Sequence, residues 1–371
     1  MEEASFVDIT REKFYRAVAG CKPLFAWFSL TDACNLDCKY CFNADVKYCS
    51  PDSPGPVHHE LSTEEVFNIV DNIAEAGTEI VMFAGGEPTL REDLVDIVGY
   101  ASSRVRVAMN SNGYLLDERL CRDLAEAGLS QVKISVDGME KNHDWNRGEG
   151  SFQRTMDALR NLVKVGIPTV MLIMTLTRLN YDELEAMVEL SMSMGVDFTM
   201  VEFLPLGRAS ERKEWTLTKE QLERAQRYLV EAQQRYGWQR VAFENRYIVA
   251  EDEYCKKICA GPNEPCGFYD FCVGCITGIY SYCITASGKV AAGDIMTLEV
   301  GDLRKERLKD IWENAELFKL IRSRENLKGR CGKCQYRYIC GGCRRRAYTY
   351  TGDIMATDPG CWRGVGDKFE T

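Results

Sequence analysis

Three cysteines in one short segment constrain this chain more than any other feature of its sequence. Cys34, Cys38 and Cys41 stand in LTDACNLDCKYCF with the spacing CxxxCxxC. Soft thiolate ligands favour iron–sulfur clusters, and a cubane cluster usually takes four protein ligands. Three ligands would leave one iron open to a small molecule. A zinc knuckle is a poorer interpretation, because no His or Cys follows at zinc-site spacing.

The chain then alternates short apolar runs with amphipathic stretches as far as about residue 205. This alternation predicts an α/β fold with a parallel sheet and helices outside it. One helix should begin with a capping box from Ser62 to Glu65 and end at Gly77. The predicted strands are 26–31, 79–84, 105–110, 131–136, 169–175 and 198–204, and further helical segments are 159–166 and 184–195.

The character of the sequence changes in its last third. Residues 206–254 read as a bridge that contains one amphipathic helix, 217–237, and we expect a domain boundary near 240–254. From Cys255 onward cysteines are dense, and 307–322 is the remaining long helical pattern. The segment CGKCQYRYICGGC supplies four closely spaced cysteines, and one more follows near the end. These five are Cys331, Cys334, Cys340, Cys343 and Cys361.

Composition narrows the classes of protein. The chain has 371 residues and 17 Cys, and its N-terminus is polar without an apolar signal region. Such a composition predicts a reduced, metal-binding, cytoplasmic protein rather than a disulfide-stapled one, and we expect it to work under anaerobic conditions. No run of about 18 apolar residues predicts a membrane span. The net charge of −10 argues against nucleic acid, and three His argue against a His-based hydrolase.

The cysteine triplet after a first strand, followed by GGEP at 85–88, resembles the radical S-adenosylmethionine (SAM) enzymes. The five-cysteine block resembles the SPASM extension found in many of them. The resemblance implies a partial (β/α)6 TIM barrel followed by a small Cys-rich SPASM domain. It divides the chain into an arm (1–25), the barrel (26–205), a bridging stretch (206–254) and the SPASM domain (255–371).

The same resemblance implies the cofactors. A [4Fe–4S] cluster on Cys34, Cys38 and Cys41 would bind SAM at its open iron, and electron transfer would cleave SAM to a 5′-deoxyadenosyl radical. The amino group of SAM would bind the GGEP loop, and its ribose would bind a Ser at the end of a strand. Its carboxylate would bind the guanidinium of an Arg, and its adenine would contact the backbone after the sixth strand. The corresponding positions are Gly85, Gly86, Glu87, Ser135, Arg147 and Leu204.

One or two auxiliary [4Fe–4S] clusters are also implied. In the SPASM pattern, Cys331, Cys334, Cys340 and Cys361 hold the second cluster, while Cys343 crosses to the first. Cys275 and Cys283 are candidates for the first cluster. Gly293 stands where the family has another Cys, so Cys283 or Asp294 could replace it, or one iron could be open. The upstream cysteines Cys255, Cys259, Cys266 and Cys272 could form a further cluster or a zinc site, or be buried and unligated.

For several side chains the sequence leaves two interpretations open. Glu202 could face substrate or pair with an inner Arg. Arg344, Arg345 and Arg346 could bind substrate carboxylates, although compensation of cluster charge or a solvated face is favoured. His143 is expected to be structural, as is Cys121.

The substrate class stays open at this level. The ending GGCRRRAYTYTGDIMATDPGC resembles that of alternative haem and haem d1 biosynthesis enzymes, which remove or oxidise tetrapyrrole side chains. Peptide maturases of the mycofactocin and pyrroloquinoline quinone pathways share the pattern more loosely. A non-catalytic electron carrier fits less well, because a carrier needs no SAM loop. An electron donor such as ferredoxin or flavodoxin is the expected protein partner.

Overall fold

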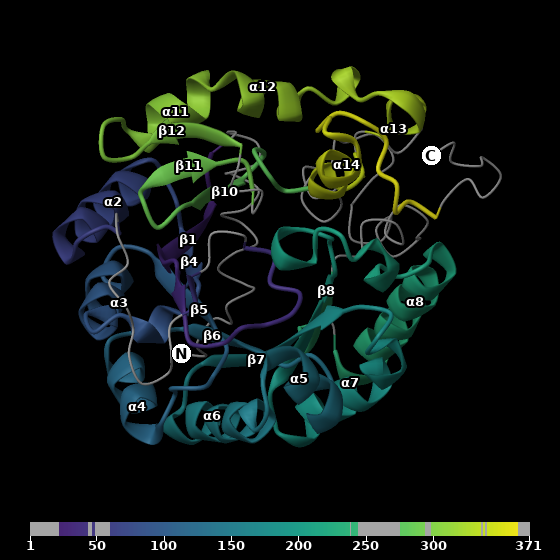
Figure 1. Cartoon of the computed structure of the whole chain (residues 1–371). Helices are drawn as coiled ribbons and strands as arrows, with labels where there is room; N and C mark the ends of the chain where they lie inside the picture. The colour runs from purple at the N-terminus through teal and green to yellow at the C-terminus, as the bar shows by residue number, and fades with distance from the viewer. Residues whose placement is uncertain are drawn as a thin grey trace.

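A parallel sheet bent into an open barrel organises the chain (Figure 1). The computed structural model describes residues 22–43, 47–48, 60–237, 239–243, 275–293, 298–334, 337 and 340–362. The α/β partial barrel with a Cys-rich C-terminal part is therefore confirmed. Its six predicted strands run parallel in the order of the sequence: β1 (Phe25–Thr31), β4 (Ile80–Gly85), β5 (Arg106–Ser111), β6 (Gln131–Ser135), β7 (Thr169–Leu176) and β8 (Asp197–Glu202).

Helices cover the convex side of this sheet. They bury one strand face in a continuous apolar core, to which β6 contributes Val132 and Ile134. Because side chains alternate along a strand, Lys133 and Ser135 of β6 face the concave side. The covering helices are α2 (Thr63–Glu75), α3 (Leu94–Ser102), α4 (Glu118–Glu126), α6 (Ser151–Val165), α7 (Leu184–Ser193) and α8 (Lys219–Tyr236).

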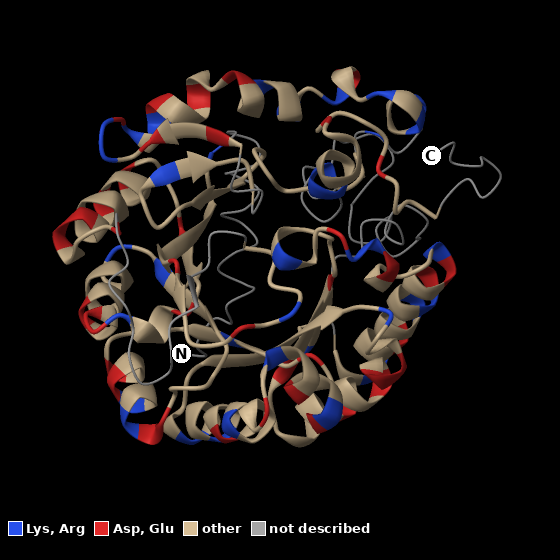
Figure 2. Cartoon of the chain, viewed as in Figure 1, with Lys and Arg blue, Asp and Glu red and all other residues tan. Residues whose placement is uncertain are grey.

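The predicted start of α2 is confirmed in detail. Ser62 Oγ accepts a hydrogen bond from Glu65 N at 3.2 Å, and the Glu65 carboxylate accepts one from Ser62 N at 2.9 Å. Acidic and basic residues are interspersed over the outer helices (Figure 2). Within the described residues, no helix combines the length and apolar character that a membrane span requires.

The sheet extends beyond the six predicted strands at both ends. β9 (Val241–Phe243) pairs parallel to β8, so α8 and β9 continue the wall of the barrel within the stretch expected to be a bridge. At the other edge β10 (Ser281–Ile284) pairs parallel to β1. β11 (Lys289–Ala291) and β12 (Glu299–Asp302) follow as antiparallel strands. The Cys-rich part of the chain thus shares one sheet with the barrel.

The predicted helix 307–322 is wrong as a single element. It forms α11 (Leu308–Asn314) and α12 (Glu316–Arg322), broken at Ala315, whose backbone is extended with φ −62° and ψ 120°. The break lets buried Trp312 and Phe318 pack with ring centroids 4.9 Å apart. Two further helices, α13 (Gly329–Lys333) and α14 (Arg344–Thr351), complete the C-terminal part.

Candidate functional site

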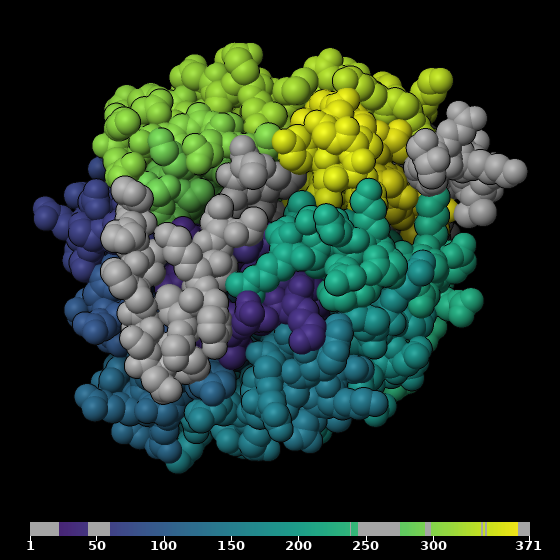
Figure 3. Space-filling model, viewed as in Figure 1, coloured from purple at the N-terminus to yellow at the C-terminus, as the bar shows by residue number. Residues whose placement is uncertain are grey.

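The cysteine triplet lies at the carboxyl end of the central strand β1. The chain leaves β1 and enters the short strand β2 (Ala33–Cys34), which pairs with β3 (Lys47–Tyr48). Cys34 is buried against Leu36, and Cys38 and Cys41 pack against the same pair. In Figure 3 the purple segment that contains the triplet reaches the surface near the centre of the face, next to teal residues. The three thiols therefore gather at the mouth of the barrel.

Two other segments hold the backbone of the cysteine loop. Lys39 N donates to Asn146 O at 3.1 Å, at the end of α5 (Glu140–Arg147). Arg208 N donates to Cys41 O at 3.0 Å from the turn after β8. Gly207 has φ +56°, and a Cβ there would lie 2.4 Å from Cys41 O. Glycine is therefore required at this position, because the turn presses directly on the loop.

The GGEP turn after β4 packs against the backbone that leads to Cys34. Gly86 N donates to Thr31 O and Glu87 N donates to Ala33 O, each at 2.7 Å. A Cβ on Gly86 would lie 2.0 Å from Ala33 O, and Gly85 has φ +132°. The two glycines thus permit a backbone-to-backbone contact that fixes the position of β2.

The Glu87 carboxylate is buried and fully used inside the protein. It accepts hydrogen bonds from Ser111 Oγ at 2.8 Å, Asn112 N at 2.7 Å and Thr89 Oγ1 at 2.6 Å. Burial raises the pKa of Glu87, and these donors partly offset that effect. Asn112 Nδ2 in turn donates to Asn35 Oδ1 at 2.8 Å. Glu87 therefore ties the ends of β4 and β5 to the residue that follows Cys34.

A buried ion pair lies beside the cysteine loop. Arg147 Nε donates to Asp137, and Arg147 Nη1 lies 3.9 Å from Cys38 Sγ. Asp137 also accepts from Asn146 Nδ2 at 3.1 Å and from Thr175 N at 3.2 Å. Burial acts to raise the pKa of Asp137, but the Arg147 guanidinium outweighs it and holds that pKa below its usual value. Arg147 is thus a fixed cation next to the triplet.

The remaining residues expected at the SAM site lie around the same mouth. Ser135 ends β6 on the concave side, and buried Leu204 lies two residues beyond β8. The Leu204 carbonyl accepts a hydrogen bond from Leu206 N at 2.8 Å. His143 is fully buried, and its Nδ1 accepts from Asp137 N at 3.3 Å. Burial lowers the pKa of His143 to about 4, as suits a neutral structural residue.

The thiols of the triplet fit a cationic metal cluster. Burial raises the pKa of Cys34 to about 12 and that of Cys38 to about 11. Thiolates here therefore need a positive centre, which cluster iron provides. In the part of the chain that is described, no three Cys, His, Asp or Glu side chains converge on a single ion. A cubane contains four irons, so its ligands need not converge on one point.

The second group of cysteines surrounds α13 and the start of α14. Backbone N–H groups already point at three of their sulfurs: Asp358 N lies 3.3 Å from Cys331 Sγ, Gly342 N lies 3.4 Å from Cys340 Sγ, and Arg346 N lies 3.4 Å from Cys343 Sγ. Such N–H donors stabilise cluster thiolates. Cys340 and Cys361 also pack against the same small apolar cluster. The arrangement fits an auxiliary iron–sulfur site.

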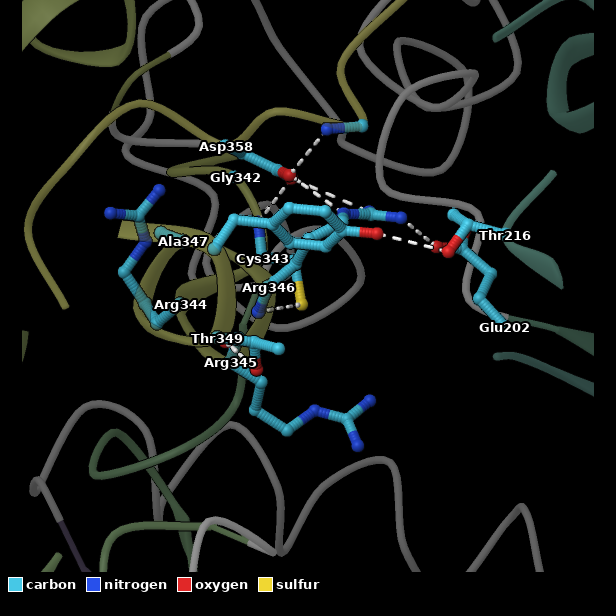
Figure 4. A network of polar contacts seen from close by, with 12 residues as sticks. Glu202, Thr216, Gly342, Cys343, Arg344, Arg345, Arg346, Ala347, Thr349 and Asp358 are labelled. Atoms are coloured by element: carbon cyan, nitrogen blue, oxygen red, sulfur yellow. Dashed lines mark hydrogen bonds and ion pairs between the residues drawn. The ribbon is translucent and has the colours of Figure 1, made fainter. Parts of the chain in front are cut away.

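Arg346 connects this cysteine block to the barrel (Figure 4). Its guanidinium pairs with Asp358 Oδ1 at 2.7 Å and with Glu202, the last residue of β8. Asp358 Oδ2 also accepts from Cys343 N at 2.6 Å. Glu202 therefore pairs with an inner Arg, which decides between its two interpretations.

The arginine run is not a solvated face. Arg344 is fully buried, and its Nη1 donates to Ile354 O at 2.9 Å and to Ala356 O at 2.8 Å, while its Nη2 lies 3.7 Å from Cys331 Sγ. Arg345 points away from the carboxylates that Arg346 contacts (Figure 4). Compensation of charge near the cysteines is the interpretation that these contacts favour.

Cys275 and Cys283, the candidates for the first auxiliary cluster, are both buried. Arg324 Nη2 donates to Cys275 O at 3.4 Å, and a Cβ on Gly341 would meet the same guanidinium. Cys275 is therefore close to the segment that carries Cys343. Gly293 has φ +67°, and a Cβ there would lie 2.7 Å from Thr277 Oγ1, which disfavours a thiol at this position. The further candidates Cys255, Cys259, Cys266, Cys272 and Asp294 lie outside the described residues.

One further expectation is confirmed, and two residues of the site were not predicted. Cys121 is buried in the core on α4, as expected of a structural residue. The pairing of Asp137 with Arg147 was not predicted from the sequence. The ten-residue separation of the two gave no helical or strand spacing that would signal it. Nor did the sequence predict a role for Lys133, although a Lys within a strand of a covered parallel sheet is itself unusual.

The Arg346 network predicts a large effect on stability. Arg346→Met should lower the free energy of unfolding by about 3–5 kcal/mol, because it leaves two buried carboxylates unpaired. Arg122→Met is the control: it removes an exposed pair with Glu118, and its cost should be below about 0.5 kcal/mol. Urea denaturation midpoints would compare them. Equal small shifts would contradict the role assigned to Arg346.

Comparisons with known proteins agree with this geometry. The chain matches the Radical SAM superfamily over residues 28–191 and the SPASM iron–sulfur cluster-binding domain over residues 275–335. An AdoMet-dependent heme synthase of Methanosarcina barkeri is 32% identical over 358 residues, which span 95% of this chain and 99% of that protein. A PqqA peptide cyclase of Granulibacter bethesdensis is 30% identical over 91% of this chain and 87% of its own length.

A solved structure supports the fold. Streptococcus suis SuiB, in a crystal structure bound to the precursor peptide SuiA, superposes with a TM-score of 0.72 at 16% identity, covering 95% of this chain and 80% of that one. Sequence, fold and cysteine placement therefore lead to one conclusion: this chain is a radical SAM enzyme with a SPASM domain, and its cofactors are a [4Fe–4S] cluster, S-adenosylmethionine and auxiliary iron–sulfur clusters.

Proposed function

We propose that the enzyme oxidises or removes a carboxyl-bearing side chain of a tetrapyrrole. The observation that carries this proposal is the 32% identity with an AdoMet-dependent heme synthase over nearly the full length of both chains. An Fe-coproporphyrin III synthase of the same organism is also related, at 27% identity over 92% of this chain. The ending of the sequence, GGCRRRAYTYTGDIMATDPGC, supports the same substrate class.

The residues at the barrel mouth have distinct roles in this proposal. Cys34, Cys38 and Cys41 hold the cluster, which with SAM supplies a 5′-deoxyadenosyl radical for hydrogen abstraction. Arg147, fixed by Asp137 beside Cys38, presents its guanidinium to the carboxylate of SAM. The protein itself orients the reactants and excludes water.

The other expected SAM contacts belong to the same proposal. The backbone at Gly85 and Gly86 faces the amino group of SAM. Ser135 faces its ribose, and the backbone at Leu204 faces its adenine. Glu87 acts through its hydrogen bonds to Ser111 and Asn112, which keep β2 in place. It is therefore a positioning residue in our account.

The proposed reaction releases an electron, which favours an enzyme that carries auxiliary clusters. Converting a propionate to a vinyl group releases carbon dioxide, one hydrogen atom that leaves with 5′-deoxyadenosine, and one electron. We assign the auxiliary iron–sulfur clusters as the acceptor of that electron. Cys331, Cys334, Cys340 and Cys361 would hold one of them, and Cys343 with the candidates Cys275 and Cys283 would belong to the other. A reduced ferredoxin or flavodoxin would supply the electron for SAM cleavage.

A peptide maturase is the second candidate. The relation to a PqqA peptide cyclase at 30% identity favours it. Cross-linking within a peptide also leaves surplus electrons, so the auxiliary site suits either substrate.

The triplet is tested by substitution. Cys34→Ala should abolish formation of 5′-deoxyadenosine in anaerobically reconstituted, reduced protein, because the cluster loses a buried ligand, while most of the iron remains at the auxiliary site. Cys121→Ala, a buried thiol in the core, should retain cleavage. Chromatography would quantify 5′-deoxyadenosine, and iron analysis would follow the clusters. Retained cleavage in Cys34→Ala would refute the assignment.

The substrate is tested by anaerobic turnover read by mass spectrometry. Reconstituted enzyme, reductant and SAM would be offered didecarboxysirohaem and iron-coproporphyrin separately. We expect a mass loss that matches side-chain removal, with one 5′-deoxyadenosine for each side chain changed. Abundant 5′-deoxyadenosine with unchanged tetrapyrroles would reject the tetrapyrrole substrate and leave the peptide maturase.

A further inference from the structure

We propose that Lys133, together with Asn110, forms a carboxylate-binding subsite inside the barrel that anchors a side chain of the substrate. This inference rests on the proposed function, because it takes the ligand to be a carboxylate of a tetrapyrrole. It adds a substrate contact on the floor of the site, away from the cysteine loop.

Lys133 projects into the concave interior of the barrel. Its neighbours Val132 and Ile134 on β6 belong to the apolar core under the helices, so Lys133 faces the other way. Its Nζ lies 5.7 Å from the centroid of the Trp27 ring on β1. Strands β4 and β5 separate β1 from β6 in the sheet, so the two side chains can meet only across the concave face.

The charge of Lys133 has no anionic partner in the described part of the chain. Its ammonium lies over the Trp27 ring, and cation–π contacts of this kind are modest. Lys289, by comparison, pairs with Asp302 at 3.0 Å. Burial lowers the pKa of Lys133 to about 8. A desolvated ammonium without a counter-ion is costly, so an incoming carboxylate would meet a strong local attraction.

Asn110 supplies a second polar group at the same level. It is the register partner of Lys133 on the adjacent strand β5. Its Oδ1 is buried, and among the described residues this atom has no hydrogen-bond partner. Buried amide atoms are nearly always hydrogen-bonded, and the amide can present either its oxygen or its nitrogen to a ligand. With the amide turned so that its nitrogen takes this position, Asn110 would donate a hydrogen bond to one oxygen of a carboxylate whose charge pairs with Lys133.

The subsite lies at a useful depth. Lys133 lies two residues before Ser135, on the same face of β6. Ser135 ends the strand at the barrel mouth, where the cysteine loop lies. A substrate side chain that reaches Lys133 therefore extends inward from the mouth. The rest of the substrate would then lie near the cysteine triplet, where hydrogen abstraction takes place. One anchored carboxylate would thus select which side chain reacts.

Binding measurements on three variants test the proposal. Iron-coproporphyrin binding to reconstituted enzyme with SAM would be followed by its absorbance. Lys133→Met should weaken binding about 10- to 100-fold, the effect of losing one charge-assisted hydrogen bond. Lys133→Arg should recover part of the affinity. Lys309→Met, at an exposed position on α11, is the control and should bind like wild type.

An ester probe and a stability measurement separate ligand binding from a structural role. The tetramethyl ester of iron-coproporphyrin should bind wild type weakly and should not distinguish Lys133→Met from it. Lys133→Met should keep or raise the thermal midpoint, because it removes a partly desolvated charge that has no anionic partner among the described residues. A lowered midpoint with equal losses for acid and ester would show a structural residue and overturn the proposal.

The remaining outcomes are also decisive. If wild type converts the tetrapyrrole and Lys133→Met binds it with unchanged affinity, the subsite is wrong while the proposed function stands. If wild type neither binds nor converts any tetrapyrrole, both are overturned.

Discussion

The contact between the GGEP turn and the backbone before Cys34 is the constraint on which the site depends. Two glycines let the backbones approach so closely that a Cβ at Gly86 would lie 2.0 Å from Ala33 O. The buried Glu87 carboxylate then joins this turn to the end of β5. The first cysteine is therefore placed by three neighbouring strands, and the loop that carries the other two is covered by α5 and the turn at Gly207.

Positively charged side chains inside the molecule have different roles. Arg147 pairs with Asp137 and lies beside Cys38. Its guanidinium can still donate hydrogen bonds to an anionic ligand there. Arg346 is neutralised by Asp358 and Glu202, and it joins the auxiliary cysteines to the last barrel strand. These paired cations hold parts of the structure in place. In our account Lys133 differs because its counter-ion arrives with the substrate.

Local sequence patterns predicted the barrel well because each of its elements is defined by neighbouring residues. Apolar runs marked the six strands, and a capping box marked the start of α2. The short strands β9 and β10 were missed because they have little local pattern of their own. Ala315 breaks a helix despite its high helix propensity, because the packing of Trp312 on Phe318 decides the backbone there.

The candidate site was predictable to a smaller extent. The spacing of the cysteines predicted the triplet and the C-terminal cysteine block, because the ligands within each set are close together in the sequence. The pairing of Glu202 with Arg346 joins residues 144 positions apart, and nothing near either residue signals it. Lys133 did carry a signal, because a charged residue is unusual within a strand of a parallel sheet that helices cover. Its partners across the barrel depend on the curvature of the sheet.

The central claim is that one cluster-binding triplet at the barrel mouth works with a separate auxiliary iron–sulfur site in the C-terminal part. The most direct test is iron analysis with Mössbauer spectroscopy on wild-type protein after anaerobic reconstitution. Two cubane sites predict at least about eight iron atoms per chain, all in [4Fe–4S] clusters. A value near about four would mean a single cluster and would contradict the account.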